Sequence, residues 1–143
     1  MKIRLLMLVI LAIVTATHGQ VIKKCDGTIL LSTSRNVGQL SQNEIVDFLL
    51  TFGSECRDNV EFSEWSNELL FDILDKQTEV TIKILEREES KIDIDAILDE
   101  LASPVNDGIN VTKLIPKVEK VKINDLLKRE ILARLKIADE HMN

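Results

Sequence analysis

Three carboxylates follow one another at helical spacing near the middle of the chain. Glu61, Glu64 and Glu68 stand at positions i, i+3 and i+7, so they share one face if the segment is a helix. Such a group could hold a hard cation such as calcium, and a pair could catalyse glycoside hydrolysis. A solvated helix face explains the same spacing, and among 24 acidic residues some suitable pair is expected by chance. We therefore predict no metal site and no catalytic residue here.

Nucleophilic catalysis lacks a base in this sequence. The chain has two histidines, His18 in the amino-terminal segment and His141, which stands third from the last residue, where chains fray. Phosphate-cradling glycine loops and H-E-x-x-H or C-x-x-C motifs are missing from the sequence. We predict a non-enzymatic protein without a cofactor, and an acid-based cell-wall hydrolase is the least favoured alternative.

Trp65 is the single tryptophan of the chain and stands among the three glutamates. Tryptophan is enriched among the residues that dominate binding interfaces. A tryptophan on a helix with apolar neighbours such as Leu69 is more often part of the core, and we favour that interpretation. The candidate binding surface is therefore Glu61, Glu64, Trp65 and Glu68.

Cys25 and Cys56 are the only two cysteines. An even number in an exported chain favours a disulfide, because nothing outside the cytoplasm keeps thiols reduced. Closing a loop of about 30 residues stabilises a fold by roughly 3.5 kcal/mol in the chain-entropy model. A redox pair would prefer closer spacing, and a zinc site would need further ligands. We predict a structural disulfide.

The first nineteen residues have the composition of a signal peptide. Two basic residues precede an apolar run over 5–14, and small or polar residues follow. The run is shorter than the about 20 residues of a membrane span. Small residues place the cleavage after Ala16 or Gly19. No lipobox precedes Cys25, so we predict a secreted or periplasmic protein without a stable membrane anchor after cleavage.

Charge is unevenly distributed along the chain. Residues 41–107 hold 18 acids and 5 bases, whereas 113–143 hold 8 bases and 5 acids. Loss of two basic residues with the predicted signal peptide changes the net charge from −6 to −8. Such polarity either reflects solvated helix faces or steers a cationic partner. The acidic excess argues against nucleic-acid binding, which needs a basic surface.

Helical periodicity begins at residue 41. Short polar residues that could start helices, each followed by apolar residues on one face, recur at Ser41, Ser63, Thr78, Asp93, Asn110 and Asn124. The last five are spaced by 15, 15, 17 and 14 residues, which predicts stacked helical hairpins. Pro116 predicts that the fifth helix either starts there or is kinked.

The strand-like pattern of the chain is confined to residues 20–40. Asp26-Gly27 is a turn signal, and the short apolar run Thr28–Leu31 follows it. We expect an extended arm that Cys25 ties to the rest of the chain. The predicted fold is all-α, with this arm over 20–40 and a single helical domain over 41–143. It contains about five or six short helices, as an irregular bundle or a small α-solenoid-like stack.

These observations favour an exported protein that binds another protein, in the manner of an inhibitor or an immunity protein. A partner that is cationic would match the acidic middle of the chain. The alternative from another class is a small carrier that holds an apolar ligand between helices. It predicts a dry pocket near Trp65, lined by leucine, isoleucine and phenylalanine.

Overall fold

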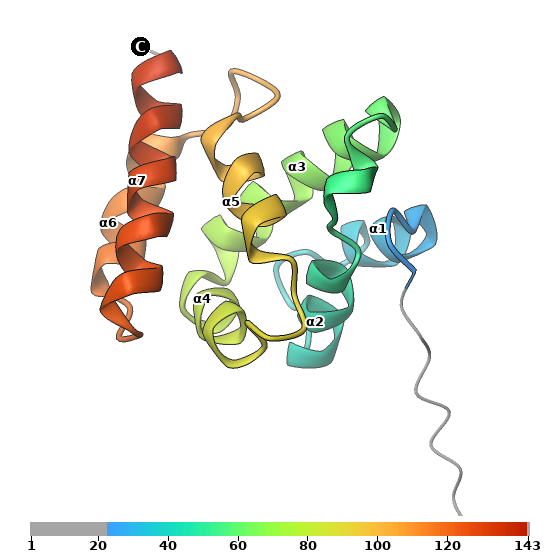
Figure 1. Cartoon of the computed structure of the whole chain (residues 1–143), viewed down its shortest axis with the longest axis horizontal. Helices are drawn as coiled ribbons and strands as arrows, with labels where there is room; N and C mark the ends of the chain where they lie inside the picture. Colours follow the sequence, from blue (N-terminus) through green and yellow to red (C-terminus); the bar gives the residue numbers. More distant parts are fainter. Residues whose placement is uncertain (1–22, 143) are drawn as a thin grey trace, which may run out of the picture.

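The computed structural model describes residues 23–142, and the predicted signal peptide over 1–19 lies outside them. In this part of the chain there are seven α-helices, one 3-10 turn and no strand (Figure 1). The all-α prediction is confirmed, with more helices than the five or six expected. The elements are α1 (Gly27–Ser34), α2 (Gln42–Leu50), η1 (Ser54–Cys56), α3 (Val60–Lys76), α4 (Thr78–Arg87), α5 (Ile94–Ala102), α6 (Val111–Lys120) and α7 (Asp125–Met142).

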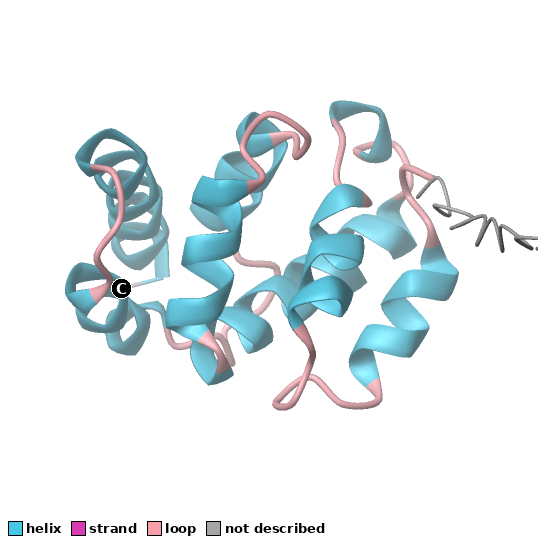
Figure 2. Ribbon diagram, turned by 90° about the horizontal axis from the view of Figure 1, so that it is seen from below, coloured by secondary structure: helices cyan, strands magenta, loops and turns pink. Residues whose placement is uncertain are grey.

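The helices stack in two layers. The odd-numbered helices α1, α3, α5 and α7 contact one another in chain order, and so do the even-numbered helices α2, α4 and α6. Contacts of α1 with α2, α3 with α4 and α6 with α7 join the layers. Figure 2 shows the helices side by side, from the α6–α7 hairpin at one end to α1 at the other. This small helical bundle thus has the predicted order of stacked hairpins.

One apolar core runs through both layers. Its largest fully buried side chains come from five different helices, and Phe48 packs edge-on against Phe52 with ring centroids 5.1 Å apart. Because every helix contributes buried residues to this core, the stack is a single unit. The contributors include Leu30, Phe48, Leu70, Ile82, Leu101, Ile131 and Leu135.

Within the described part of the amino-terminal arm, Gly27–Ser34 forms a helix, so the expectation of an extended conformation is wrong there. Asp26 is the N-cap of α1, because its carboxylate accepts a hydrogen bond from the backbone N–H of Thr28 at 2.9 Å. An Asp-Gly pair signals a turn through the same kind of bond, which is why the local sequence is ambiguous. Full burial of Leu30 then holds α1 against α2 and α3.

Most predicted helix starts are confirmed. Ser41 and Glu44 form a reciprocal capping box at α2, and Thr78 is the first residue of α4. Asp93, Asn110 and Asn124 each accept a hydrogen bond from a backbone N–H two or three residues ahead, at 3.1, 3.0 and 2.8 Å. These short polar side chains start the helices that the sequence indicates.

The start of α3 differs from the prediction. Its N-cap is Asn59, whose side chain accepts from the N–H of Phe62 at 3.2 Å, and Ser63 lies inside the first turn. The earlier start places Phe62 on the buried face of the helix, where only 4% of it stays exposed. Asn59 and Ser63 are N-cap residues of similar strength. The free energy gained by burying Phe62 favours the helix that starts after Asn59.

Helix α6 runs through Pro116 rather than starting there. Proline lacks the N–H that would bond the carbonyl of Thr112, so the helix loses one internal hydrogen bond at this place. The ring of Pro116 is exposed, whereas Leu114 and Val118 on either side are buried. The free energy gained by burying Leu114 and Val118 therefore exceeds the cost of the missing hydrogen bond.

Candidate functional site

Helix α3 carries a continuous row of exposed acids. At 100° per residue its five solvent-facing carboxylates fall within about 80° of the helix circumference. The opposite face, with Leu70, Ile73 and Leu74, is fully buried and fixes the rotation of the helix. We call the exposed row the acidic ridge; it consists of Glu61, Glu64, Glu68, Asp72 and Asp75.

The four residues of the predicted binding surface lie together. Glu61, Glu64, Trp65 and Glu68 line one open depression of about 600 Å³, and Val60 completes it. Val60 was not foreseen, although 63% of it is exposed. A correct prediction of the helix start would have indicated it. With Asn59 as the N-cap, Val60 is the first residue of α3 and lies on its exposed side.

Trp65 belongs to both the core and the surface. It is half-buried and packs against the apolar core, yet it also lines the depression. Beside it lies a smaller cavity of about 200 Å³, whose walls include Leu30, Phe62 and Cys25. Among the described residues none accepts a hydrogen bond from the indole N–H. The tryptophan is therefore anchored on one side and open on the other.

Neutralisation of the acidic ridge changes along its length. Asp75 pairs with Lys117 at 2.5 Å and Asp72 with Lys76 at 3.8 Å. Within residues 23–142, Glu61 and Glu64 form no ion pair. The unneutralised charge thus gathers at the amino-terminal end of α3, beside Trp65 and Val60, where the helix dipole also favours carboxylates.

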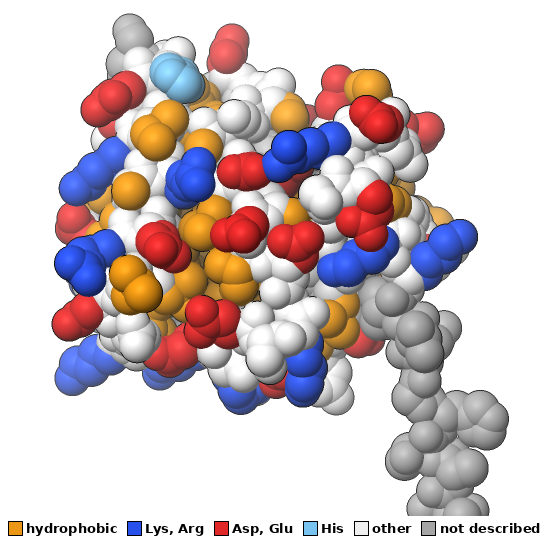
Figure 3. Space-filling view, viewed as in Figure 1, with side chains coloured by type: hydrophobic (Ala, Val, Ile, Leu, Met, Phe, Trp, Pro, Cys, Tyr) orange, Lys and Arg blue, Asp and Glu red, His pale blue; other side chains and the backbone are white. Residues whose placement is uncertain are grey.

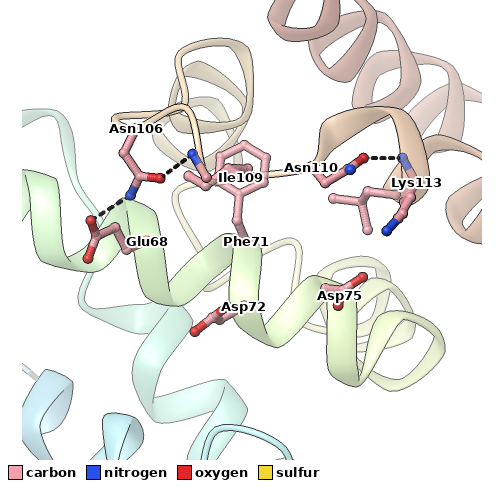
Figure 4. Close-up of a pocket in the computed structure, with 10 residues that line it drawn as sticks. Glu68, Phe71, Asp72, Asp75, Asn106, Ile109, Asn110 and Lys113 are labelled. Atoms are coloured by element: carbon pink, nitrogen blue, oxygen red, sulfur yellow. Dashed lines mark hydrogen bonds between the residues drawn. The ribbon is translucent and has the colours of Figure 1, made fainter. Parts of the chain in front are cut away.

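The carboxy-terminal end of the ridge forms one wall of a second pocket, of about 410 Å³ (Figure 4). The other wall is the loop that leads from α5 into α6, and Lys113 lines it from α6. Asn106 of this loop donates a hydrogen bond to Glu68 at 2.6 Å, so Glu68 is held at the junction of the two hollows. The spacing of Glu68, Asp72 and Asp75 is the sequence signal that could have shown this extension.

Asn67 holds the loop in place opposite the ridge. Its buried amide group donates to the carbonyl oxygens of Glu100 and Ser103 at 3.1 and 3.2 Å and to the Glu100 carboxylate at 2.7 Å. Its oxygen accepts from the N–H of Val105 at 3.1 Å. Burial raises the pKa of Glu100, and the hydrogen bond from Asn67 partly offsets this. One side chain thus joins α3 to the end of α5.

The predicted disulfide between Cys25 and Cys56 is present, with the two Cα atoms 5.5 Å apart. Cys25 also donates its backbone N–H to the carbonyl of Thr51 at 2.9 Å. Both bonds fix the start of α1 next to η1 and the beginning of α3. The small cavity beside Trp65 is therefore bounded by a covalently fixed segment.

Among the described residues, no three histidine, cysteine, aspartate or glutamate side chains are placed to hold a metal ion. His141 lies exposed near the end of α7. None of the helices within residues 23–142 has the length and hydrophobicity needed to cross a bilayer.

The face seen in Figure 3 contrasts with the acidic ridge, because acidic and basic side chains are interspersed there. Ion pairs also join the helices: Arg134 of α7 and Arg57, which follows η1, both pair with Asp99 of α5. No protein-family model, curated protein or solved structure matches this chain. Inferences about function therefore rest on the surfaces described above.

Proposed function

We propose that this protein is exported, has no enzymatic activity and binds a cationic protein partner through the depression formed by Val60, Glu61, Glu64, Trp65 and Glu68. The observation that carries the proposal is the arrangement on α3: two carboxylates without an ion pair stand beside an exposed valine and a half-buried tryptophan. Binding interfaces commonly combine an aromatic anchor with a polar rim.

Each part of the depression has a distinct task in this proposal. Glu61 and Glu64 attract lysine and arginine side chains and speed the encounter, an effect that salt screens. Trp65 provides apolar contact area. Because its inner side already packs against the core, it loses little freedom when a partner covers it.

An inhibitor or immunity protein is the concrete form that we favour. The acidic ridge would occupy a basic groove of a cell-wall hydrolase and block access of its substrate. The excess of acids over bases in residues 41–107 and the predicted signal peptide support this version.

The carrier alternative has less support. The cavity beside Trp65 includes the polar residues Asn59 and Glu61 in its walls and has a volume of only about 200 Å³, whereas small-molecule pockets are mostly apolar and usually reach roughly 300–1,000 Å³. The hydrolase alternative calls for a general acid with a raised pKa in the site. Asp47 and Glu100, whose pKa burial raises, line neither the depression nor the adjoining pocket.

The test starts with immobilised protein exposed to an extracytoplasmic extract at low salt. The dissociation constant of the captured and purified partner is then measured for the wild type, Glu61→Gln/Glu64→Gln and Trp65→Ala. We expect each variant to bind at least about tenfold more weakly, and high salt to weaken the wild type.

The matched control is Glu119→Gln/Glu140→Gln, which removes the same charge from exposed positions on α6 and α7. It should bind within about twofold of the wild type. A partner whose affinity ignores both the α3 substitutions and salt would contradict the proposal, as would failure to capture any protein. Loss of cell-wall hydrolysis by the partner on binding would identify the inhibitor form.

A further inference from the structure

A second charged surface lies between α4 and α6. It is a pocket of about 490 Å³, and it is basic although the chain as a whole carries a net charge of −6. Four lysines from two separate parts of the sequence meet there. The lining residues are Thr78, Glu79, Lys83, Lys117, Lys120, Val121 and Lys122.

Two of the four lysines are paired and two are not. Lys83 pairs with Glu79 at 2.6 Å, and Lys117 with Asp75 at 2.5 Å. Within residues 23–142, Lys120 and Lys122 form neither an ion pair nor a side-chain hydrogen bond. Four lysines less two carboxylates leave a formal charge of +2 at the pocket.

This arrangement is not explained by the helices alone. Lysines near the carboxy terminus of α6 complement its helix dipole, which accounts for Lys117 and Lys120. Lys83 comes from α4 and Lys122 from the segment after α6, so packing brings further like charges into the same hollow. Glu79 and Asp75 offset the charges of Lys83 and Lys117, and a bound anion would offset those of Lys120 and Lys122.

We propose that this lysine pocket binds a phosphate monoester. A phosphate monoester carries about −1.5 to −2 charges at pH 7, which matches the formal charge of the pocket. Lysine ammonium groups bind phosphate as point charges, and the volume leaves room for the group that the phosphate esterifies. The hydroxyl of Thr78 donates to the carbonyl of Leu74 at 2.5 Å, so the lysines are the donors.

This site touches the carboxy-terminal end of the acidic ridge through the ion pair of Lys117 with Asp75, but it does not depend on the proposed protein partner, whose depression lies at the other end of α3. Glu79 is the one carboxylate that lines it, and its pKa is lowered by the hydrogen bond from Lys83. Glu79 therefore stays ionised and competes with a bound anion for Lys83. Its replacement by glutamine should strengthen binding.

The test is an NMR titration of the protein with glucose 6-phosphate at pH 7.5, followed through the backbone amides near Lys83, Lys120 and Lys122. We expect saturable shifts there and weakening by at least about tenfold in Lys120→Gln/Lys122→Gln. Glu79→Gln should bind more tightly than the wild type. Glucose without phosphate serves as the ligand control.

The matched protein control is Lys91→Gln/Lys136→Gln, which removes the same charge from exposed positions outside the pocket. It should bind within about twofold of the wild type. Equal weakening in both double variants would mean that net charge alone attracts the ligand, which would overturn the proposal. The circular dichroism spectrum of each variant verifies that it folds.

A second arm of the experiment distinguishes the source of the phosphate. Vesicles of phosphatidylcholine with and without phosphatidic acid present the same monoester as a lipid headgroup. Retention on phosphatidic acid vesicles that is lost in Lys120→Gln/Lys122→Gln assigns the site to a lipid, and binding of glucose 6-phosphate alone assigns it to a soluble ligand. If the wild type binds neither, the pocket is not a phosphate site.

Discussion

The two ends of the helical stack are held together in different ways. At the amino-terminal end, directional bonds add to the apolar packing of Leu30 and Phe48: the disulfide fixes Cys25, and the side chain of Gln77 both donates to and accepts from the backbone of Leu40 at 2.9 Å. At the carboxy-terminal end, α6 and α7 meet through the apolar side chains of Leu114, Val118, Ile131 and Leu135.

Helix length explains this difference. Helices α1 and α2 have 8 and 9 residues, whereas α7 has 18. A short helix presents fewer turns with which to bury apolar side chains, so tertiary bonds add to its stability. A long amphipathic helix such as α7 depends less on such bonds, although Thr112 donates one to Asp139 at 2.6 Å, because successive turns contribute buried residues. The terminal helices at the two ends of the stack are thus stabilised by different combinations of tertiary bonds and apolar packing.

Removal of the disulfide should have the largest effect. We expect Cys25→Ser/Cys56→Ser to lose roughly 3.5 kcal/mol of unfolding free energy, because a sequence separation of 31 residues is no longer constrained in the unfolded chain. Urea denaturation with and without a reductant measures this loss. The reductant should destabilise the wild type to the level of the variant and leave the variant unchanged. A loss below about 1 kcal/mol would mean that packing alone holds this end.

A cavity in α7 should have a comparable or slightly smaller effect, without dependence on redox state. Ile131→Ala removes a fully buried side chain, and we expect a loss of about 3 kcal/mol in the same denaturation experiment. Leu126→Ala is the control on the same helix, because 59% of Leu126 is exposed and its loss should change stability by less than about 0.5 kcal/mol. Similar losses in both variants would refute the apolar account of this end.

The smallest expected effect concerns the polar joint between α3 and α5, and it depends on pH. Burial raises the pKa of Glu100 in the folded protein. Its contribution to stability is therefore present below the pKa of the unfolded state and is lost as the pH rises through the folded-state pKa. Glu100→Gln cannot ionise, so it should gain stability relative to the wild type as the pH rises from the pKa of the unfolded state through that of the folded state.

Thermal unfolding at several pH values measures this change. Glu89→Gln, at an exposed position, removes the same charge and serves as the comparison. A constant difference between Glu100→Gln and the wild type over this pH range would show that the carboxylate is solvated in the folded state.

Local signals account for the parts of the fold that the sequence predicts. Ser41, Asp93, Asn110 and Asn124 each start a helix through a bond to a nearby N–H, and such a bond depends on a few neighbouring residues. Helix α1 could not be predicted in this way, because its short apolar run is as compatible with a strand as with a helix. Only the packing of Leu30 against two other helices settles the matter.

The candidate sites likewise divide into one that local sequence predicts and one that depends on tertiary packing. The shared face of Glu61, Glu64 and Glu68 follows from spacing within one helix, and the structure places them accordingly. The lysine pocket could not be predicted, because Lys83 and Lys117 meet only when α4 packs against α6. Periodicity describes a helix surface, but it does not tell which two surfaces will face each other.

The hydrogen bonds of the Asn67 side chain restrict which residues can replace it. Its amide donates to three oxygens and accepts from one N–H, so both ends of the group are in use. Aspartate has the same shape but would oppose those three oxygens with another oxygen, next to a second carboxylate. Deamidation over time would cause the same damage as a mutation. Homologues that keep the loop after α5 should therefore keep asparagine here, even where the surrounding surface has changed.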